Sequence, residues 1–128
     1  MTQHAAEAQI RTLIEAWADA VRRHDYAGVL AHHDRDIIMF DVPPPLQSRG
    51  LDAYRKTWDL FFGYHQPSYA FDIEDIAITA GDDVAFAVVV MRCGPPQDTF
   101  PFRLTIGLRK IDGDWRIMHE HHSVPSEV

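Results

Sequence analysis

The sequence predicts an α+β domain in which three helices precede an antiparallel sheet. The first observation is a change of period: apolar residues recur at helical spacing up to about residue 62 and alternate from about residue 69 onward. The second is that the alternating part is divided into strand-length segments by turn residues, which is typical of an antiparallel meander. Helices that precede strands in this way indicate helices packed on one face of a curved sheet.

Length and composition fit one domain, residues 1–128, with its own core. The hydrophobic fraction of 46% is ordinary, and no apolar run is long enough to span a membrane. The first residues lack the layout of a signal peptide, and Cys93 is the only cysteine, so we expect a cytoplasmic protein without disulfides. A net charge of −7 argues against binding to phosphate backbones, so we expect no nucleic-acid partner.

The N-terminal half predicts three helices. The first runs from about residue 5 to 23, and its apolar residues at helical spacing are Ile10, Leu13, Ile14, Trp17 and Val21. A charged break separates it from a shorter helix that ends near His33. A third helix follows Gly50, and its apolar side carries Tyr54, Trp58, Phe61 and Phe62.

A short buried strand over residues 37–40 is expected after a turn at 34–36, and it places Asp41 at its end. The prolines at 43–45 fit neither a sheet interior nor a helix, so they predict a rigid loop. A carboxylate between a strand end and prolines is partly desolvated, which strengthens it as a general base. Asp41 is therefore the best single catalytic candidate, and the alternative is a loop aspartate that caps a backbone N–H.

The C-terminal half predicts four strands. Residues 70–79 alternate, and residues 84–92 are almost wholly apolar, which predicts a strand buried on both faces. Residues 100–109 alternate most cleanly. The turn at Asp112-Gly113 leads into a last strand that ends before Pro125.

The last strand carries most of the ionisable candidates, and its side chains alternate between two faces. One face carries Trp115, Ile117, His119, His121 and Ser123, and the other carries Arg116, Met118, Glu120, His122 and Val124. A two-residue turn pairs Leu108 with Ile117 and places His119 and His121 on the apolar face of the preceding strand. A three-residue loop with a bulge shifts the pairing by one and places Glu120 and His122 there instead. The local sequence leaves both registers open.

His119 and His121 form an H-x-H pair whose side chains leave the strand about 7 Å apart. Two ligands are too few for a metal, and the spacing offers no third. We therefore predict no metal site and favour a structural or dimer-interface role for this pair, and a metal bound at the two histidines is the third and weakest hypothesis.

The order of elements, Trp17, Asp41 before its proline loop and the closing Trp115…His119-Glu120-His121-His122-Ser123 resemble the nuclear transport factor two-like superfamily. More narrowly, they resemble its SnoaL-like branch, which also contains ketosteroid isomerases and the association domain of calcium/calmodulin-dependent protein kinase. The resemblance implies a cone-shaped, cystatin-like roll with a deep pocket between helices and sheet. It also implies a homodimer through the outer face of the sheet.

On the ketosteroid isomerase pattern, Asp41 falls on the general base. The pocket tyrosines of that enzyme fall on Trp17, His33 and Trp58. Its protonated acid falls at or near Gly107, so the resemblance implies that the base is kept and the oxyanion hole is not. In SnoaL-like cyclases the catalytic acid of the last strand falls on His122, which favours Glu120 and His122 pointing inward.

These features support two functions. The first is a cofactor-independent isomerase, cyclase or dehydratase acting on a small apolar carbonyl or polyketide-like compound, in which Asp41 abstracts a proton and His122, tuned by Glu120, donates one. The second is a non-catalytic ligand-binding or oligomerisation module, which a pocket filled by its own aromatic side chains and an exposed Asp41 would favour. The expected ligand-binding residues are Trp17, His33, Tyr54, Trp58, Phe86, Val88, Arg103 and Met118. Arg103 could instead face solvent or a partner subunit.

Overall fold

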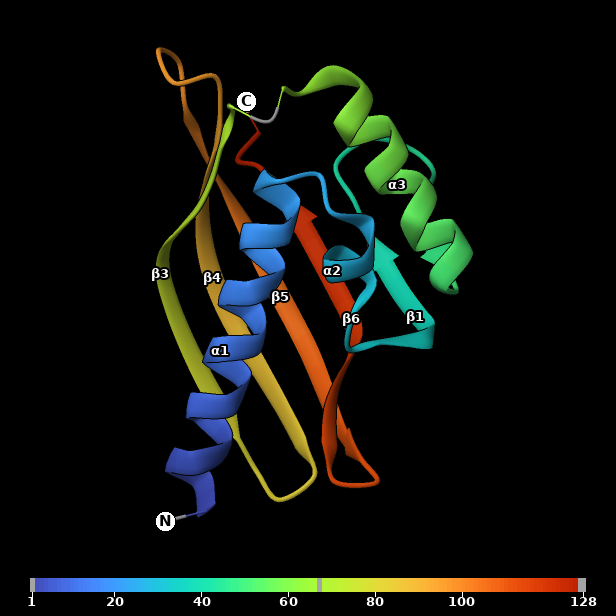
Figure 1. The fold of residues 1–128 in the computed structure, drawn as a ribbon, viewed down its shortest axis with the longest axis vertical. Helices are drawn as coiled ribbons and strands as arrows, with labels where there is room; N and C mark the ends of the chain where they lie inside the picture. The colour runs from blue at the N-terminus through green and yellow to red at the C-terminus, as the bar shows by residue number, and fades with distance from the viewer. Residues whose placement is uncertain (1, 67, 127–128) are drawn as a thin grey trace.

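The computed structural model describes residues 2–66 and 68–126. Within these ranges three helices lie on one face of a six-stranded sheet (Figure 1). The helices are α1 (Thr2–Arg22), α2 (Tyr26–Leu30) and α3 (Leu51–Tyr64). The strands are β1 (His33–Phe40), β2 (Ser48–Arg49), β3 (Ala70–Ala80), β4 (Val84–Gly94), β5 (Phe100–Ile111) and β6 (Asp114–Ser123). The predicted α+β class, with helices packed on a curved sheet, is confirmed.

The sheet has the order β2-β1-β6-β5-β4-β3. Strands β3 to β6 form an antiparallel meander, whereas β1 runs parallel to β6 and places an early segment beside the last one. Helix α1 packs against β3, and α3 packs against β1 and β2 at the opposite edge of the same face (Figure 1). None of the helices in the described ranges has the length and apolar character that a bilayer crossing requires.

The core lies between α1 and the inner face of the sheet. On α1, residues spaced by three or four positions are buried, namely Ile10, Ile14, Trp17 and Val21. The sheet contributes alternate residues, among them Ala87, Val89 and Met91 of β4 and Leu104 and Ile106 of β5. Each large apolar side chain buried in this way contributes roughly 1.5–3 kcal/mol of transfer free energy.

Strand β4 differs from its prediction because only one of its faces is covered. The exposed fractions are 59% for Val84, 48% for Phe86, 50% for Val88 and 36% for Val90, and the residues between them are buried. The expectation that residues 84–92 are buried on both faces was therefore wrong. All three helices lie on one side of the sheet, so nothing in the described chain covers the other side of β4.

Residues 34–36 also differ from their prediction, because they belong to β1 rather than to a turn. The pairing of β1 with β6 nevertheless skips them: His33 pairs with Ile117, and the next pair is Ile38 with His119. The polar residues at 34–36 thus lie in the part of β1 that does not pair with β6.

The β5–β6 hairpin has the two-residue turn. Ile111 pairs with Asp114, and Asp112 and Gly113 have φ values of 51° and 85°, the positive values that a type I′ turn requires. Leu108 therefore pairs with Ile117.

A β-bulge at Met118 then changes the register of β6. The next pair after Leu108 and Ile117 is Gly107 with His119, so Met118 is an extra residue with no partner on β5. Inward-facing residues are odd-numbered before the bulge and even-numbered after it, and Glu120 is completely buried. Both registers left open by the sequence therefore occur in β6: the register of the two-residue turn holds before Met118, and the register shifted by one residue holds after it.

Candidate functional site

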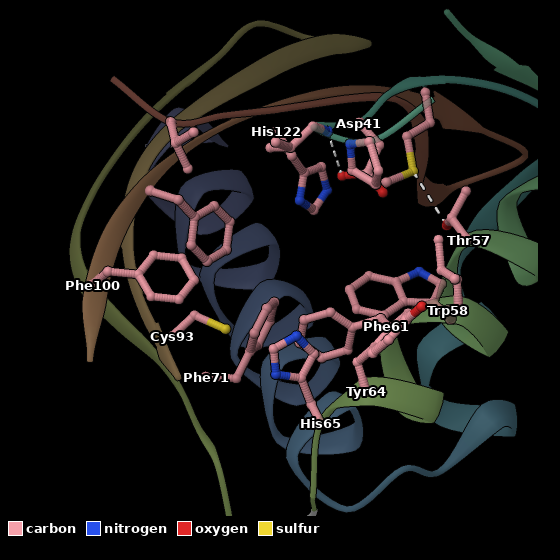
Figure 2. A pocket seen from close by; sticks show the side chains of 16 residues that line it. Asp41, Thr57, Trp58, Phe61, Tyr64, His65, Phe71, Cys93, Phe100 and His122 are labelled. Carbon is pink, nitrogen blue, oxygen red and sulfur yellow. Dashed lines mark hydrogen bonds between the residues drawn. The ribbon is translucent and has the colours of Figure 1, made fainter. Parts of the chain in front are cut away.

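A cavity of about 290 Å³ lies between α3 and the inner face of the sheet (Figure 2). Most of its wall is apolar, and the aromatic side chains in it are Trp58, Phe61, Tyr64, Phe71, Phe100 and Phe102. The polar side chains that line it are Asp41, Thr57, His65, Cys93 and His122. Cavities that hold small molecules are mostly apolar with a few placed polar groups, and this one lies near the lower end of their size range.

His122 is the polar residue that the fold fixes most firmly in this wall. Its Nε2 lies 2.9 Å from Oε1 of Glu120, and its ring stacks on Phe102 with an interplanar angle of 10°. Glu120 pairs with Met39 on β1 and Ile106 on β5, and it is completely buried. A buried carboxylate that accepts from one ring nitrogen holds the imidazole in place and leaves the other nitrogen for a ligand.

Three side chains behind the cavity wall connect to the other carboxylate oxygen of Glu120. Nε2 of His33 lies 2.7 Å from Oε2, and the hydroxyl of Tyr54 donates to the same oxygen at 2.8 Å. Nε1 of Trp17 in turn donates to the Tyr54 hydroxyl at 3.1 Å. Buried carboxylates are tolerated when they are paired and hydrogen-bonded, and Glu120 meets both conditions.

The network also sets the protonation of its members. Burial alone would raise the pKa of Glu120, but the hydrogen bonds and charges of His122 and His33 outweigh it and lower that pKa from 4.5 to about 2. Burial, followed by the charge and hydrogen bond of Glu120, raises the pKa of Tyr54 well above its ordinary value of 10.0. Glu120 therefore accepts hydrogen bonds as a carboxylate, and Tyr54 donates as a neutral phenol.

Asp41 lies beside His122 on the cavity wall. Phe40 pairs with His121 on the neighbouring parallel strand, and Asp41 and His122 are the residues that directly follow this pair. Figure 2 shows both side chains on the same wall. Asp41 is half-buried, and its Oδ1 accepts the backbone N–H of Val42 at 2.8 Å. Asp41 therefore caps a backbone N–H, as the alternative of a loop aspartate predicts, and it also lines the cavity.

Cys93 and His65 complete the polar part of the wall away from Asp41 and His122. Burial raises the pKa of the Cys93 thiol to about 11, so the thiol is neutral near pH 7. Burial and then the charge of His24 lower the pKa of His65, whose ring stacks on Phe61. Neither residue could be identified from a sequence pattern, since each stands alone in an apolar or loop segment.

A second cavity of about 240 Å³ adjoins the first and shares four lining residues with it, Asp41, Pro43, Thr57 and Leu60. Its other walls are the proline loop, β2 and the face of α3 that carries Ala53 and Lys56. A ligand longer than the first cavity has room to continue past Asp41.

The sequence-predicted site residues fall into three groups. Asp41, Trp58 and His122 line the main cavity. Trp17, His33, Tyr54 and Glu120 are buried directly behind its wall and do not line it, because their polar atoms are turned into the Glu120 network. They support the wall rather than contact a ligand.

The remaining predicted residues do not line either cavity. Phe86 and Val88 of β4 and Arg103 of β5 are exposed on the outer face of the sheet, because inward and outward side chains alternate and these occupy outward positions. Met118 is the bulged residue and is half-buried away from the cavities. For ligand contact, all four assignments from the sequence are corrected.

The H-x-H pair faces away from the cavity. Nδ1 of His119 lies 2.6 Å from the carbonyl oxygen of Ile38, and His121 is exposed. Their ring centroids are 6.4 Å apart, and both rings lie against Phe40. Across residues 2–66 and 68–126, no group of three or more His, Cys, Asp or Glu side chains is arranged to hold a metal ion.

Comparisons with known proteins agree with this fold. A structure of a nuclear transport factor two-like protein of unknown function from Pseudomonas putida KT2440 superposes with a TM-score of 0.91 and 37% identity, over 97% of this chain and 89% of that one. A proposed ketosteroid isomerase from Parabacteroides distasonis ATCC 8503 superposes with a TM-score of 0.75 and 19% identity, over 91% of this chain and 86% of that one. A protein with a cystatin-like fold from Nostoc punctiforme PCC 73102 superposes with a TM-score of 0.79 and 15% identity, over 94% of this chain and 92% of that one. These last two show the fold alone.

No curated protein matches the sequence. The SnoaL-like domain family matches residues 10–127, which is nearly the whole chain. Together with the relative from Pseudomonas putida, this match shows that the chain belongs to the SnoaL-like domain family.

Proposed function

We propose that this protein is a cofactor-independent acid–base catalyst, an isomerase, cyclase or dehydratase, for a small apolar carbonyl compound. The observation that carries the proposal is His122, which a buried carboxylate anchors through one ring nitrogen on the wall of an aromatic cavity. Asp41, directly after the neighbouring strand β1, gives the same wall a second group that can exchange a proton. Two adjacent acid–base groups in an apolar cavity suit chemistry in which a proton leaves one carbon and another is delivered nearby.

His122 is the better candidate for the abstracting base. With Nε2–H donating to Glu120, Nδ1 carries the lone pair, and it would take the proton from a carbon next to the carbonyl to leave an enolate. Return of that proton at another carbon gives an isomer, whereas loss of a β-hydroxyl as water, protonated by the imidazolium of His122, gives a dehydrated product. The half-buried Asp41 has one oxygen held by Val42, and its other oxygen can accept a hydrogen bond or a proton on the cavity wall.

The open cavity weighs against the alternative of a pocket filled by its own side chains. Trp17 lies behind the wall, and Trp58 lines it without closing the space of about 290 Å³. A non-catalytic ligand-binding protein of the same fold would retain the cavity but would not depend on His122.

A substrate panel separates these two functions. Apolar β,γ-unsaturated ketones and β-hydroxyketones both yield conjugated products, so turnover is followed by ultraviolet absorbance, and binding is followed by thermal shift. His122→Asn is expected to lower kcat by roughly 10²–10⁴-fold, the usual contribution of a general base, and Asp41→Asn by a smaller factor. His121→Asn, on the exposed face next to His122, is the matched control and should retain activity. Ligands that bind without turnover, or full activity of His122→Asn, would support the non-catalytic alternative.

The uncovered face of β4 supports a homodimer through the outer side of the sheet. Val84, Phe86, Val88 and Val90 form an apolar row along one strand, and apolar rows of this kind mark contact surfaces. Light scattering of the purified protein should give twice the chain mass, and Val88→Glu should give the monomer mass. Ala16→Glu, at an exposed position of α1, adds the same charge and should leave the dimer intact. A monomeric wild-type protein would contradict this assignment.

A further inference from the structure

Both ring nitrogens of His33 face hydrogen-bond acceptors. Nδ1 lies 2.8 Å from the carbonyl oxygen of Ala31, and Nε2 lies 2.7 Å from Oε2 of Glu120. A carbonyl oxygen can only accept, so Nδ1 must carry a hydrogen. The side chain of His33 has no exposed surface, so water cannot supply a different partner.

The protons of the neighbouring groups are already accounted for. The indole N–H of Trp17 can only donate, so it uses a lone pair of the Tyr54 hydroxyl. That hydroxyl has one proton, which it donates to Oε2 of Glu120 at 2.8 Å. It also lies 2.9 Å from Nε2 of His33, to which it can then offer only its second lone pair. The short contact between Nε2 of His33 and Oε2 therefore needs a proton of its own, and His33 already carries one on Nδ1. The low pKa of Glu120 supports placing this extra proton on the imidazole.

We propose that His33 is a buried imidazolium that neutralises Glu120 and so keeps His122 neutral, with its proton-accepting Nδ1 available to the cavity. Glu120 then orients His122 through Oε1 while its charge is balanced through Oε2. His33 does not line the cavity, so it is a positioning residue that acts through Glu120. Only the catalytic consequence rests on the function proposed above.

Removal of the His33 charge should make His122 a stronger base. Glu120 would then be an unbalanced carboxylate 2.9 Å from Nε2 of His122 and would favour a second proton on that ring. For a unit charge acting across one carboxylate in a protein interior, the second protonation of His122 should move upward by roughly one to two pH units.

Other groups around His122 stay in place in this experiment. Asp41 stands beside it just after β1, while Cys93 of β4 and His65 after α3 line the same cavity. The rings that pack against His122 are aromatic and do not titrate in this range: Trp17 of α1, Trp58 of α3 and Phe102 of β5. A change in His122 on substitution of His33 therefore reports the path through Glu120.

Nitrogen-15 NMR of the histidine rings tests the proposal without a substrate. In the wild-type protein at about pH 7, His33 should show two protonated nitrogens and His122 should be the neutral Nε2–H tautomer. In His33→Gln, whose amide donates without a charge, the His122 transition should rise by one to two units. His32→Gln, at the exposed neighbouring position, should leave it unchanged.

A neutral His33 in the wild-type spectrum would overturn the proposal, as would an unshifted His122 in a folded His33→Gln. If His33→Gln does not fold, the wild-type spectrum and Glu120→Gln decide the question, because His33 should lose its second proton when the carboxylate is removed. A protonated His33 in a protein that turns nothing over would leave this inference standing and remove only the proposed catalysis. When a substrate is found, His33→Gln should also shift the acid limb of its pH–rate profile upward.

Discussion

Replacement of Glu120 by glutamine is the most informative perturbation of this protein. The amide keeps the shape of the side chain, but it carries no charge and cannot accept at both positions. Three donors converge on the carboxylate at 2.7 Å, 2.8 Å and 2.9 Å, from His33, Tyr54 and His122. After substitution, a buried imidazolium at His33 would lose its counterion or its proton.

The pKa of Glu120 gives the size of the effect and its pH dependence. The pKa falls from 4.5 in the unfolded chain to about 2 in the folded protein. A shift of about 2.5 units corresponds to roughly 3 kcal/mol of stability, which agrees with the roughly 3–5 kcal/mol expected for breaking a buried pair. Because the folded value is the lower one, this stabilisation is complete above about pH 4.5 and is lost as the pH falls toward 2.

Urea denaturation followed by tryptophan fluorescence measures this difference. At pH 7, Glu120→Gln should be less stable than wild type by about 3 kcal/mol or more, and at about pH 2.5 the two proteins should differ by roughly 1 kcal/mol or less. Glu15→Gln, at an exposed position of α1, changes the same charge and should stay within about 0.5 kcal/mol at both pH values.

The decisive quantity is how much the destabilisation caused by Glu120→Gln differs between the two pH values. If Glu120→Gln destabilised the protein equally at pH 7 and at about pH 2.5, Glu120 would be protonated in the folded state and the cause would be packing alone. Equal stability of variant and wild type at pH 7 would refute the reasoning about the network as a whole.

Three further experiments test other parts of the structure. Tyr54→Phe removes a hydroxyl that bridges Trp17 and Glu120 and should cost about 1–3 kcal/mol in urea denaturation, because it leaves buried polar groups short of a partner; a cost near zero would mean that the hydroxyl is dispensable. Deletion of Met118 removes the bulge and turns Glu120 outward, so near-ultraviolet circular dichroism should show loss of native packing, whereas Met118→Ala should retain it. Cys93 should react slowly with iodoacetamide at pH 7, because burial raises the pKa of its thiol to about 11, and the reaction rate should rise with pH. A ligand bound in the cavity should slow the reaction further, and a fast reaction that no ligand slows would contradict the place of Cys93 in the wall.

Most of the fold could be predicted because helical and strand periods are local properties of the sequence. The apolar spacing on α1 and the alternation of β5 both follow from the side that each element buries. Strand β4 could not be assigned correctly in the same way. Its outward residues Phe86 and Val88 are as apolar as its inward ones, so the sequence shows no difference between a core face and an exposed face.

The cavity was less predictable than the fold because its residues come from six elements. Asp41 could be identified from a strand end followed by prolines, and His122 from a resemblance to cyclases. Phe71, Cys93 and Phe102 line the same space, but each looks like an ordinary core residue within its strand. Their common role depends on how far α3 stands from the sheet, and no local pattern specifies that separation.

The last strand shows why its register could not be derived from its own turn. The Asp112-Gly113 turn favours one register, and the side chains of Glu120 and His122 require the other. The bulge at Met118 satisfies both, and the partners that stabilise it are distant: His33 is 87 residues from Glu120, and Tyr54 is 66 residues away. A buried carboxylate without those donors would cost several kcal/mol, whereas an unpaired residue in a β ladder is commonly tolerated. The distant network, rather than the hairpin, therefore selects which histidine faces the cavity.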